Sequence, residues 1–137
     1  MYKRQDASSN NSVPMATVSQ GSAKAWLTLN GQGTIAARDS FNTASITDNG
    51  TGDYTLNFSS STANINYSIS GGTDGSNNSY PSSPSVSADI RFNSSTSSPY
   101  KSVPTTSKFT MTISTDANLA SAIDVEWAMA KVHGDLA

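Results

Sequence analysis

Residues 45–58 read SITDNGTGDYTLNF, and this stretch decides the fold class. Asn49-Gly50 is a strong dipeptide for a two-residue hairpin turn, because both central residues of such a turn need a positive φ. After the turn, apolar and polar residues alternate over 53–58, which is the period of a half-buried strand. The stretch therefore predicts a β-hairpin.

The same alternation recurs along the chain at spacings near ten residues. The other segments that show it are 23–30, 34–46, 64–69, 85–92, 108–113 and a long last strand over 123–134. Polar loops rich in Ser, Gly and Pro separate them, most clearly at 71–84 and 93–106. Seven or eight strands in this pattern predict an all-β fold, an antiparallel sandwich of jelly-roll or Greek-key type.

Composition supports the same class. The chain has 26 Ser, 15 Thr and 12 Asn among 137 residues, and these side chains compete for backbone hydrogen bonds and disfavour long helices. Residues 1–22 show no apolar period and predict an extended N-terminal arm. The predicted organisation is an arm over 1–22 and one β-sandwich domain over 23–137.

The inward-facing positions of the predicted strands define a core. Its members are Leu27, Leu29, Ile35, Leu56, Phe58, Ile65, Tyr67, Ile69, Val86, Ile90, Phe92, Phe109, Met111, Ile113, Val125 and Trp127. This core is small for the length of chain that it must order. Association of subunits would add buried area, so we predict a homo-oligomer.

Charge and cysteine content exclude several classes of partner. The net charge of -2 and only eight Lys and Arg argue against nucleic acid, whose phosphates require a basic surface. Without cysteine the chain can form neither a disulfide nor a thiolate metal site. We find no apolar run of membrane-spanning length and no secretory signal, so we predict synthesis in the cytoplasm and no membrane insertion.

Catalytic patterns are weak. His133 is the only histidine, and no Gly-x-Ser-x-Gly elbow marks one of the serines as a nucleophile. The ten acidic residues are scattered among turns and polar strand faces, and only one of them is Glu, which gives no pair for glycoside cleavage. We predict no enzyme activity, no catalytic residue and no cofactor.

The loop of the opening hairpin raises a second question, because Asp48, Asn49 and Asp53 carry hard oxygens of the kind that bind calcium. A high-affinity calcium loop places acids at alternate positions, whereas here those positions are Gly50 and Gly52. We therefore interpret the loop as a turn and predict no metal.

Three aromatic residues lie outside the predicted core. Trp26, Tyr80 and Tyr100 are candidates for contact with a receptor or a partner, because aromatic rings stack on sugars and dominate protein interfaces. The alternative is that each fills a local gap or contacts a neighbouring subunit.

Residues 23–42 read AKAWLTLNGQGTIAARDSFN and lead into the opening stretch. Together the two segments resemble a β module of tailed bacteriophage and prophage structural proteins, in which a run similar to A-K-A-W-x-x-x-N-G precedes S-I-T-D-N-G-T-G-D-Y-x-x-x-F. The resemblance is dense over residues 23–58, and the closing segment 124–130 stands where the family has its last strand.

In that family the module often ends a longer tail-fibre-like chain, and fibre tips are commonly trimeric. Here only some 22 residues precede the module, without a shaft. The resemblance then implies a separate structural protein on the virion surface, a decoration or short-fibre subunit. Its residues 1–22 would anchor it to other virion proteins, and a trimer is the favoured oligomer. The alternative is an adhesin whose loops at 71–84 and 93–106 bind a host surface glycan or protein.

Overall fold

The computed structural model describes residues 3–5, 12–73, 104–114 and 122–137. Most of these residues are in strands, which confirms the predicted all-β class. The elements are β1 (Lys3–Gln5), β2 (Ser12–Pro14), α1 (Met15–Gly21), β3 (Ala25–Asn30), β4 (Ala36–Phe41), β5 (Thr43–Gly50), β6 (Asp53–Phe58), β7 (Ser68–Thr73), β8 (Lys108–Thr112) and β9 (Ala128–His133).

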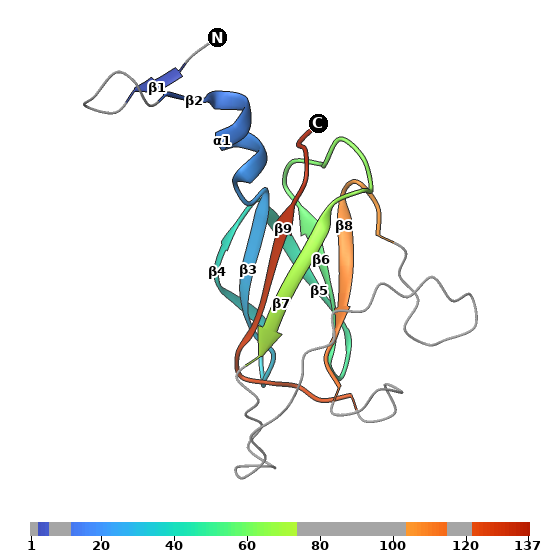
Figure 1. Cartoon of the computed structure of the whole chain (residues 1–137). Coiled ribbons are helices and arrows are strands. Elements are labelled where there is room, and N and C mark those ends of the chain that lie inside the picture. The colour runs from blue at the N-terminus through green and yellow to red at the C-terminus, as the bar shows by residue number, and fades with distance from the viewer. Residues whose placement is uncertain (1–2, 6–11, 74–103, 115–121) are drawn as a thin grey trace.

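Two antiparallel sheets form a sandwich (Figure 1). One sheet has the strand order β4-β3-β9-β7, and the other has the order β5-β6-β8. Strands β1 and β2 pair only with each other, outside the sandwich. The predicted antiparallel sandwich is therefore confirmed.

The core lies between the inward faces of the two sheets. In β3 every second residue is buried, and in β9 the same alternation continues on the neighbouring strand. The buried apolar residues are Ala25, Leu27, Leu29, Tyr54, Leu56, Phe58, Tyr67, Phe109, Met111, Ile113, Val125, Ala128, Ala130 and Val132. Period-2 patterning predicted most of them because each strand presents one face to the other sheet.

A single strand was predicted over 34–46, and this prediction is wrong. The chain forms β4 in one sheet and β5 in the other, and Asn42 between them has a φ of 54°. Asn tolerates this left-handed conformation better than most residues, and a sharp corner of this kind lets a chain change sheets. The sequence signal was present in the Asn, but the alternation on both sides hid the break.

The side chain of Asn42 holds this corner in place. Its Nδ2 donates to the carbonyl oxygens of Lys24 and Ser60, both at 3.0 Å, and its Oδ1 accepts from the Ser60 N–H at 2.6 Å. The amide thus ties the start of the first sheet to the segment that follows β6. The corner is fixed by side-chain bonds as well as by backbone preference.

Replacing Asn42 by Ala should lower the free energy of unfolding by about 2–4 kcal/mol, since three hydrogen bonds are lost and a left-handed residue gains strain. Asn42→Gly relieves the strain and should cost less than Asn42→Ala. Chemical denaturation of the three proteins checks the order. Equal stability of Asn42→Ala and the unaltered protein would contradict this role.

Two predicted core residues are exposed. Ile65 lies before β7 with 55% of its surface accessible, and Trp127 lies before β9 with 40% accessible. Both strands begin later than predicted, at Ser68 and Ala128, because the residues before them bend. The predicted strand at 85–92, with core residues Val86, Ile90 and Phe92, lies outside the described residues.

The N-terminal arm differs from the extended form that was predicted. Met15–Gly21 form helix α1, which projects beyond the end of β3 (Figure 1) and buries none of its residues. The Lys24 ammonium contacts the Ser19 carbonyl at the base of the helix. In the part of the chain that the structure describes, no helix has the length and apolar content needed to cross a membrane.

Candidate functional site

The loop of SITDNGTGDY is the β5–β6 hairpin turn, but the two residues of the turn are Thr51 and Gly52 and not the predicted Asn49 and Gly50, which end β5, with Gly50 opposite Asp53. Its second glycine, Gly52, has a φ of +66°, and a Cβ there would lie 2.6 Å from the Ile113 carbonyl oxygen and 2.8 Å from that of Ile123. The Gly52 carbonyl also accepts the Ile113 N–H at 2.7 Å. Gly52 is therefore required both for its backbone conformation and because two other segments pack directly against it.

Asp124, in the segment before β9, is the hydrogen-bond acceptor that connects this turn to the C-terminal part of the chain. Its Oδ1 accepts the Gly52 N–H at 2.7 Å and the Tyr54 hydroxyl at 2.6 Å. The same hydroxyl lies 3.1 Å from the Gly31 carbonyl oxygen. Burial, reinforced by the hydrogen bond to Asp124, raises the pKa of the Tyr54 hydroxyl. We call Gly31, Gly52, Tyr54 and Asp124 the hairpin lock.

The remaining polar residues of the loop hold the turn itself. Asp48 Oδ1 accepts the Gly50 N–H at 2.9 Å, and Asn49 Nδ2 donates to Thr55 Oγ1 at 2.9 Å and reaches Asp53 Oδ1 at 3.5 Å. Over the described ranges, no three His, Asp or Glu side chains gather as a metal site would require. The loop residues are placed for backbone geometry, as the hairpin interpretation expects.

Asp53, the first residue of β6, has a carboxyl group whose pKa departs from its usual range. Its side chain is only 7% exposed, and this burial raises its pKa, opposed by the bond from Asn49 and assisted by the charge of Asp48. A raised pKa means that the folded chain holds this proton more tightly than the unfolded chain does. Ionisation of Asp53 therefore opposes folding.

Asp53→Asn should consequently raise the melting temperature at neutral pH, because the amide keeps an oxygen for Asn49 and carries no charge. The gain should shrink as the pH falls through the folded and then the unfolded pKa of Asp53, since the native carboxyl is then protonated too. Thermal melts of both proteins between pH 3 and pH 7 check this. A gain that stays constant over that range would contradict the assignment.

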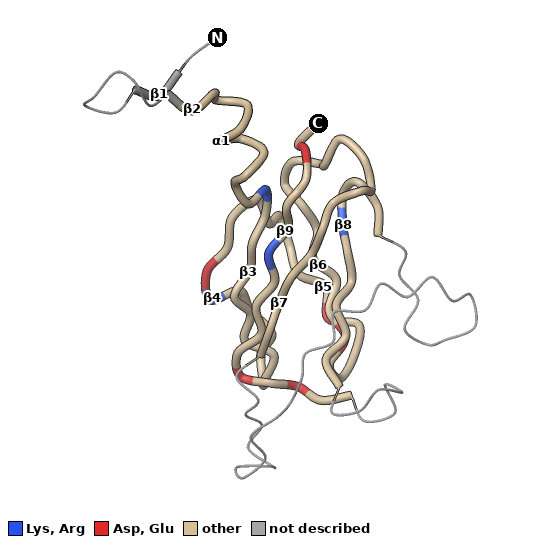
Figure 2. Tube along the Cα trace, viewed as in Figure 1, with Lys and Arg blue, Asp and Glu red and all other residues tan. Residues whose placement is uncertain are grey.

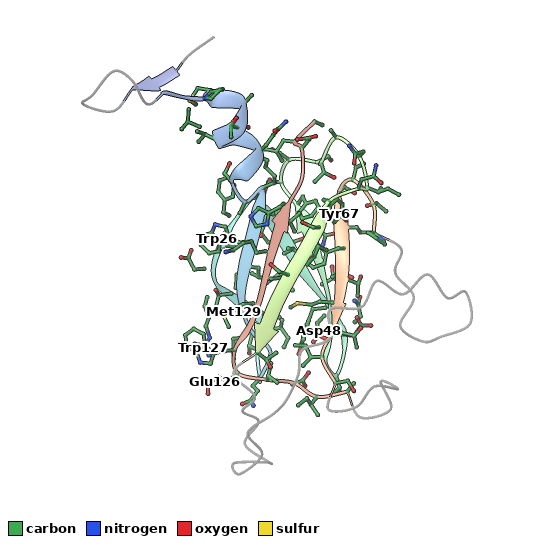
Figure 3. The ribbon with its side chains drawn as sticks, viewed as in Figure 1. Trp26, Asp48, Tyr67, Glu126, Trp127 and Met129 are labelled. Carbon is green, nitrogen blue, oxygen red and sulfur yellow. The ribbon has the colours of Figure 1, made fainter. Side chains whose placement is uncertain are left out.

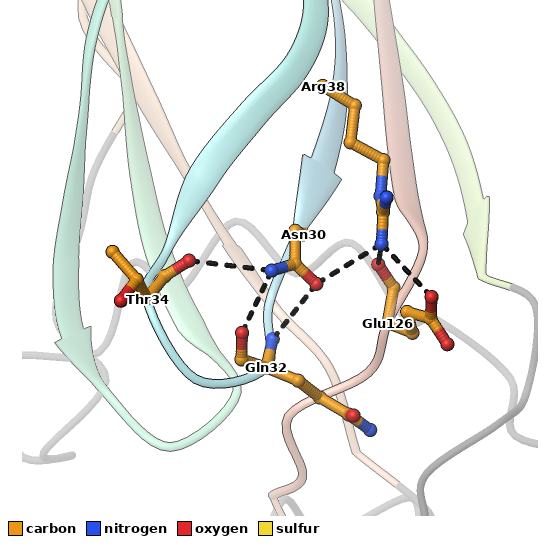
Figure 4. A network of polar contacts seen from close by, with 5 residues as sticks. All are labelled: Asn30, Gln32, Thr34, Arg38 and Glu126. Atoms are coloured by element: carbon orange, nitrogen blue, oxygen red, sulfur yellow. Dashed lines mark hydrogen bonds and ion pairs between the residues drawn. The ribbon is translucent and has the colours of Figure 1, made fainter.

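A second polar cluster joins β3, β4 and the segment before β9 (Figure 4). Arg38 Nη2 lies 3.3 Å from Asn30 Oδ1 and 3.2 Å from Glu126 Oε1, and its guanidinium stacks 3.9 Å from the centre of the Trp127 ring. Arg38 reaches this position because β4 bulges opposite Thr28 and Leu29. The cluster holds residues 126–127 against the sheet and explains why Trp127 lies outside the core.

Of the predicted contact residues, Trp26 is partly exposed and lies on the outer face of the four-stranded sheet (Figure 3). Tyr80 and Tyr100 lie outside the described residues. His133, the only histidine of the sequence, ends β9 opposite Ser68. The structure thus brings Trp26 to a surface and leaves the other two aromatic candidates untested.

Sequence reasoning missed Asp124 and the Tyr54 hydroxyl as members of the hairpin lock. Tyr54 was recognised only as an apolar strand position, and Asp124 as a polar residue of a last strand. The two residues are 70 positions apart, so no local pattern joins them. The sequence signal that could have pointed to Asp124 was its position between two apolar residues, Ile123 and Val125, directly after residues 115–122, which do not alternate as a strand would.

Comparison with protein family models, with curated proteins and with solved structures gives no significant match to this chain.

Proposed function

We propose that the chain is a non-enzymatic structural protein of a tailed phage virion, exposed on the particle surface as a decoration or short-fibre subunit. The resemblance of residues 23–58 supports this family. The observation that carries the proposal is the hairpin lock: Gly52 and Tyr54, the parts of the motif with the closest contacts, meet Asp124 and hold the sandwich together. The residues of the motif therefore contribute to the stability of the fold, which is the role expected of them in a structural protein.

The arm supports an anchoring role. Val13, Met15 and Val18 are each more than 40% exposed, and α1 buries no residue in the chain. Isolated helices of this length are marginal in water, so contact with another protein would stabilise it. We propose that residues 1–22 bind other virion proteins and that the sandwich forms a homo-oligomer, with a trimer favoured.

The second candidate is a receptor-binding adhesin that recognises a host surface glycan or protein. One observation favours it: Trp26 lines a groove on the outer face of the four-stranded sheet. The two functions are compatible in one chain, because the arm and the groove use different residues.

Deletion of residues 1–22 separates the two candidates. We expect the shortened chain to keep its β-rich circular dichroism spectrum but to be missing from particles assembled in a host that supplies it in place of the full chain. Binding of the purified shortened chain to host cells would add the adhesin function. Normal incorporation of the shortened chain would overturn the anchoring role.

A finer variant tests the apolar side chains of the arm. Met15→Ser combined with Val18→Ser should reduce incorporation, whereas Ile65→Ser, which removes an exposed apolar residue of the sandwich instead, should not. Equal incorporation of all three proteins would show that these side chains do not contact the particle.

A further inference from the structure

The outer face of the four-stranded sheet carries two adjacent rows of side chains across β3, β9 and β7. In the first row Lys131 lies opposite both Trp26 and Ser70. In the second row Met129 lies opposite both Thr28 and Gly72. Directly paired residues of neighbouring strands share a face, so all six line one surface. Figure 3 shows Trp26 and Met129 on this face, with Trp127 further along it.

A groove of about 420 Å³ runs over these rows, and the backbone of Leu27, Gly71 and Ala130 completes its lining. It arises from a difference in side-chain size. Trp26 and Met129 are large, whereas Ser70 and Gly72 are small and lie on β7, which is the edge strand of this sheet among the residues that the structure describes. A Cβ on Gly72 would meet no atom within 4 Å. The volume is in the range of small-molecule sites.

The lining has an unusual combination of groups for an exposed sheet. The Trp26 ring and the Met129 side chain offer apolar surface, the hydroxyls of Thr28 and Ser70 offer donors and acceptors, and Lys131 offers one positive charge. Lys131 is the only Lys or Arg of β9, and it stands out on that strand in Figure 2. A ligand that fits must present an apolar face, a rim of hydroxyls and a negative group.

We propose that this groove binds an acidic sugar residue of a polysaccharide, a uronic acid unit. The C–H face of the pyranose ring would stack on Trp26, its hydroxyls would bond to Thr28 and Ser70, and its carboxylate would pair with Lys131. A polymer fits because the groove opens along the sheet surface beside the edge strand β7. The proposal gives the adhesin function a ligand class and rests on that function, not on the anchoring role of the arm.

Gly72→Val offers the most specific test. The added side chain enters open space, and valine favours strands, so the fold should keep its stability while the groove is filled. Trp26→Ala removes the stacking surface, and Lys131→Gln removes the charge. Trp127→Ala is the matched control, since Trp127 is an exposed tryptophan that does not line the groove.

The probes are polygalacturonate and alginate as acidic polymers and dextran as a neutral one, with binding followed by calorimetry on the full chain. We expect binding to at least one acidic polymer and weaker binding to dextran. Trp26→Ala should weaken acidic binding by at least about tenfold. Lys131→Gln should weaken it by about two- to fivefold, as for an exposed charge pair. Gly72→Val should abolish it, and Trp127→Ala should leave it unchanged.

Three results would overturn the proposal: no binding to either acidic polymer, binding to dextran as tight as to the acidic polymers, or binding that Gly72→Val leaves intact. Incorporation of the same variants into particles is measured separately. A groove variant that enters particles normally but fails to bind keeps the structural function. An unaltered chain that binds an acidic polymer but is absent from particles keeps the groove proposal and contradicts the structural function.

Discussion

Gly52→Ala should destabilise the fold more than any other single substitution considered, by about 3–5 kcal/mol. The new Cβ would lie 2.6–2.9 Å from backbone atoms of Ile113 and Ile123, and the residue would keep a φ of +66°. Backbone atoms cannot move aside as the end of a flexible side chain can. Since domains are typically stable by only about 5–15 kcal/mol, urea denaturation should show a large loss or an unfolded protein.

Gly33→Ala is the matched control for this prediction. Gly33 has a φ of +65°, nearly that of Gly52, but its Cβ would meet no atom within 4 Å. It should therefore cost only the conformational strain, about 1–2 kcal/mol. Similar losses at Gly33 and Gly52 would show that the close approach of Ile113 and Ile123 does not matter.

Asp124→Ala should also have a large effect, a loss of about 2–4 kcal/mol. It leaves the Gly52 N–H and the Tyr54 hydroxyl without the acceptor that satisfies both. Asp124→Asn keeps an oxygen in the same place and should lose less. Glu126→Ala, two residues further on, removes only an exposed ion pair with Arg38 and should cost under about 1 kcal/mol.

A double-mutant cycle with Tyr54→Phe tests whether the two residues act together. Tyr54→Phe removes the hydroxyl and should cost about 1–2 kcal/mol alone. In the Asp124→Ala background its cost should fall, because the Asp124 carboxylate, the closer of the two partners of the hydroxyl, is already absent. Strictly additive losses would contradict the hairpin lock.

The parts of the fold that could be predicted are those encoded by local patterns. Alternation placed Leu27 and Leu29 in β3, because this signal acts over a few residues. Asn49-Gly50 indicated that a hairpin forms in this stretch, but its turn lies two residues later, at Thr51-Gly52. The turn of the chain at Asn42 was missed because similar alternation continues on both sides of it. Strand periodicity alone does not predict a corner that is fixed by the hydrogen bonds of a single side chain.

The candidate site was less predictable, because its contacts span most of the chain. Trp26 could be singled out as an aromatic residue outside the core, but its neighbours Lys131 and Gly72 come from strands far away in sequence. Trp127 was placed in the core by its period, whereas stacking on Arg38 holds it at the surface. Pairing between distant strands decides such positions, and a single sequence does not specify that pairing.

The hairpin lock and the exposed arm together give the chain the features expected of a particle subunit. The lock joins the β5–β6 hairpin to the segments after β3 and before β9, and α1 offers apolar side chains outside it. The groove at Trp26 and the arm are formed by different residues, so attachment to the particle and contact with a ligand would not compete.

We propose above all that this chain is a structural component of tailed phage particles. Quantitative mass spectrometry of particles purified from cultures that carry its gene tests this most directly. We predict that the chain co-purifies with the major capsid protein at a fixed ratio through successive density gradients. Its absence from the particle fractions, with the protein present in the surrounding lysate, would show that the chain is not a component of the particle.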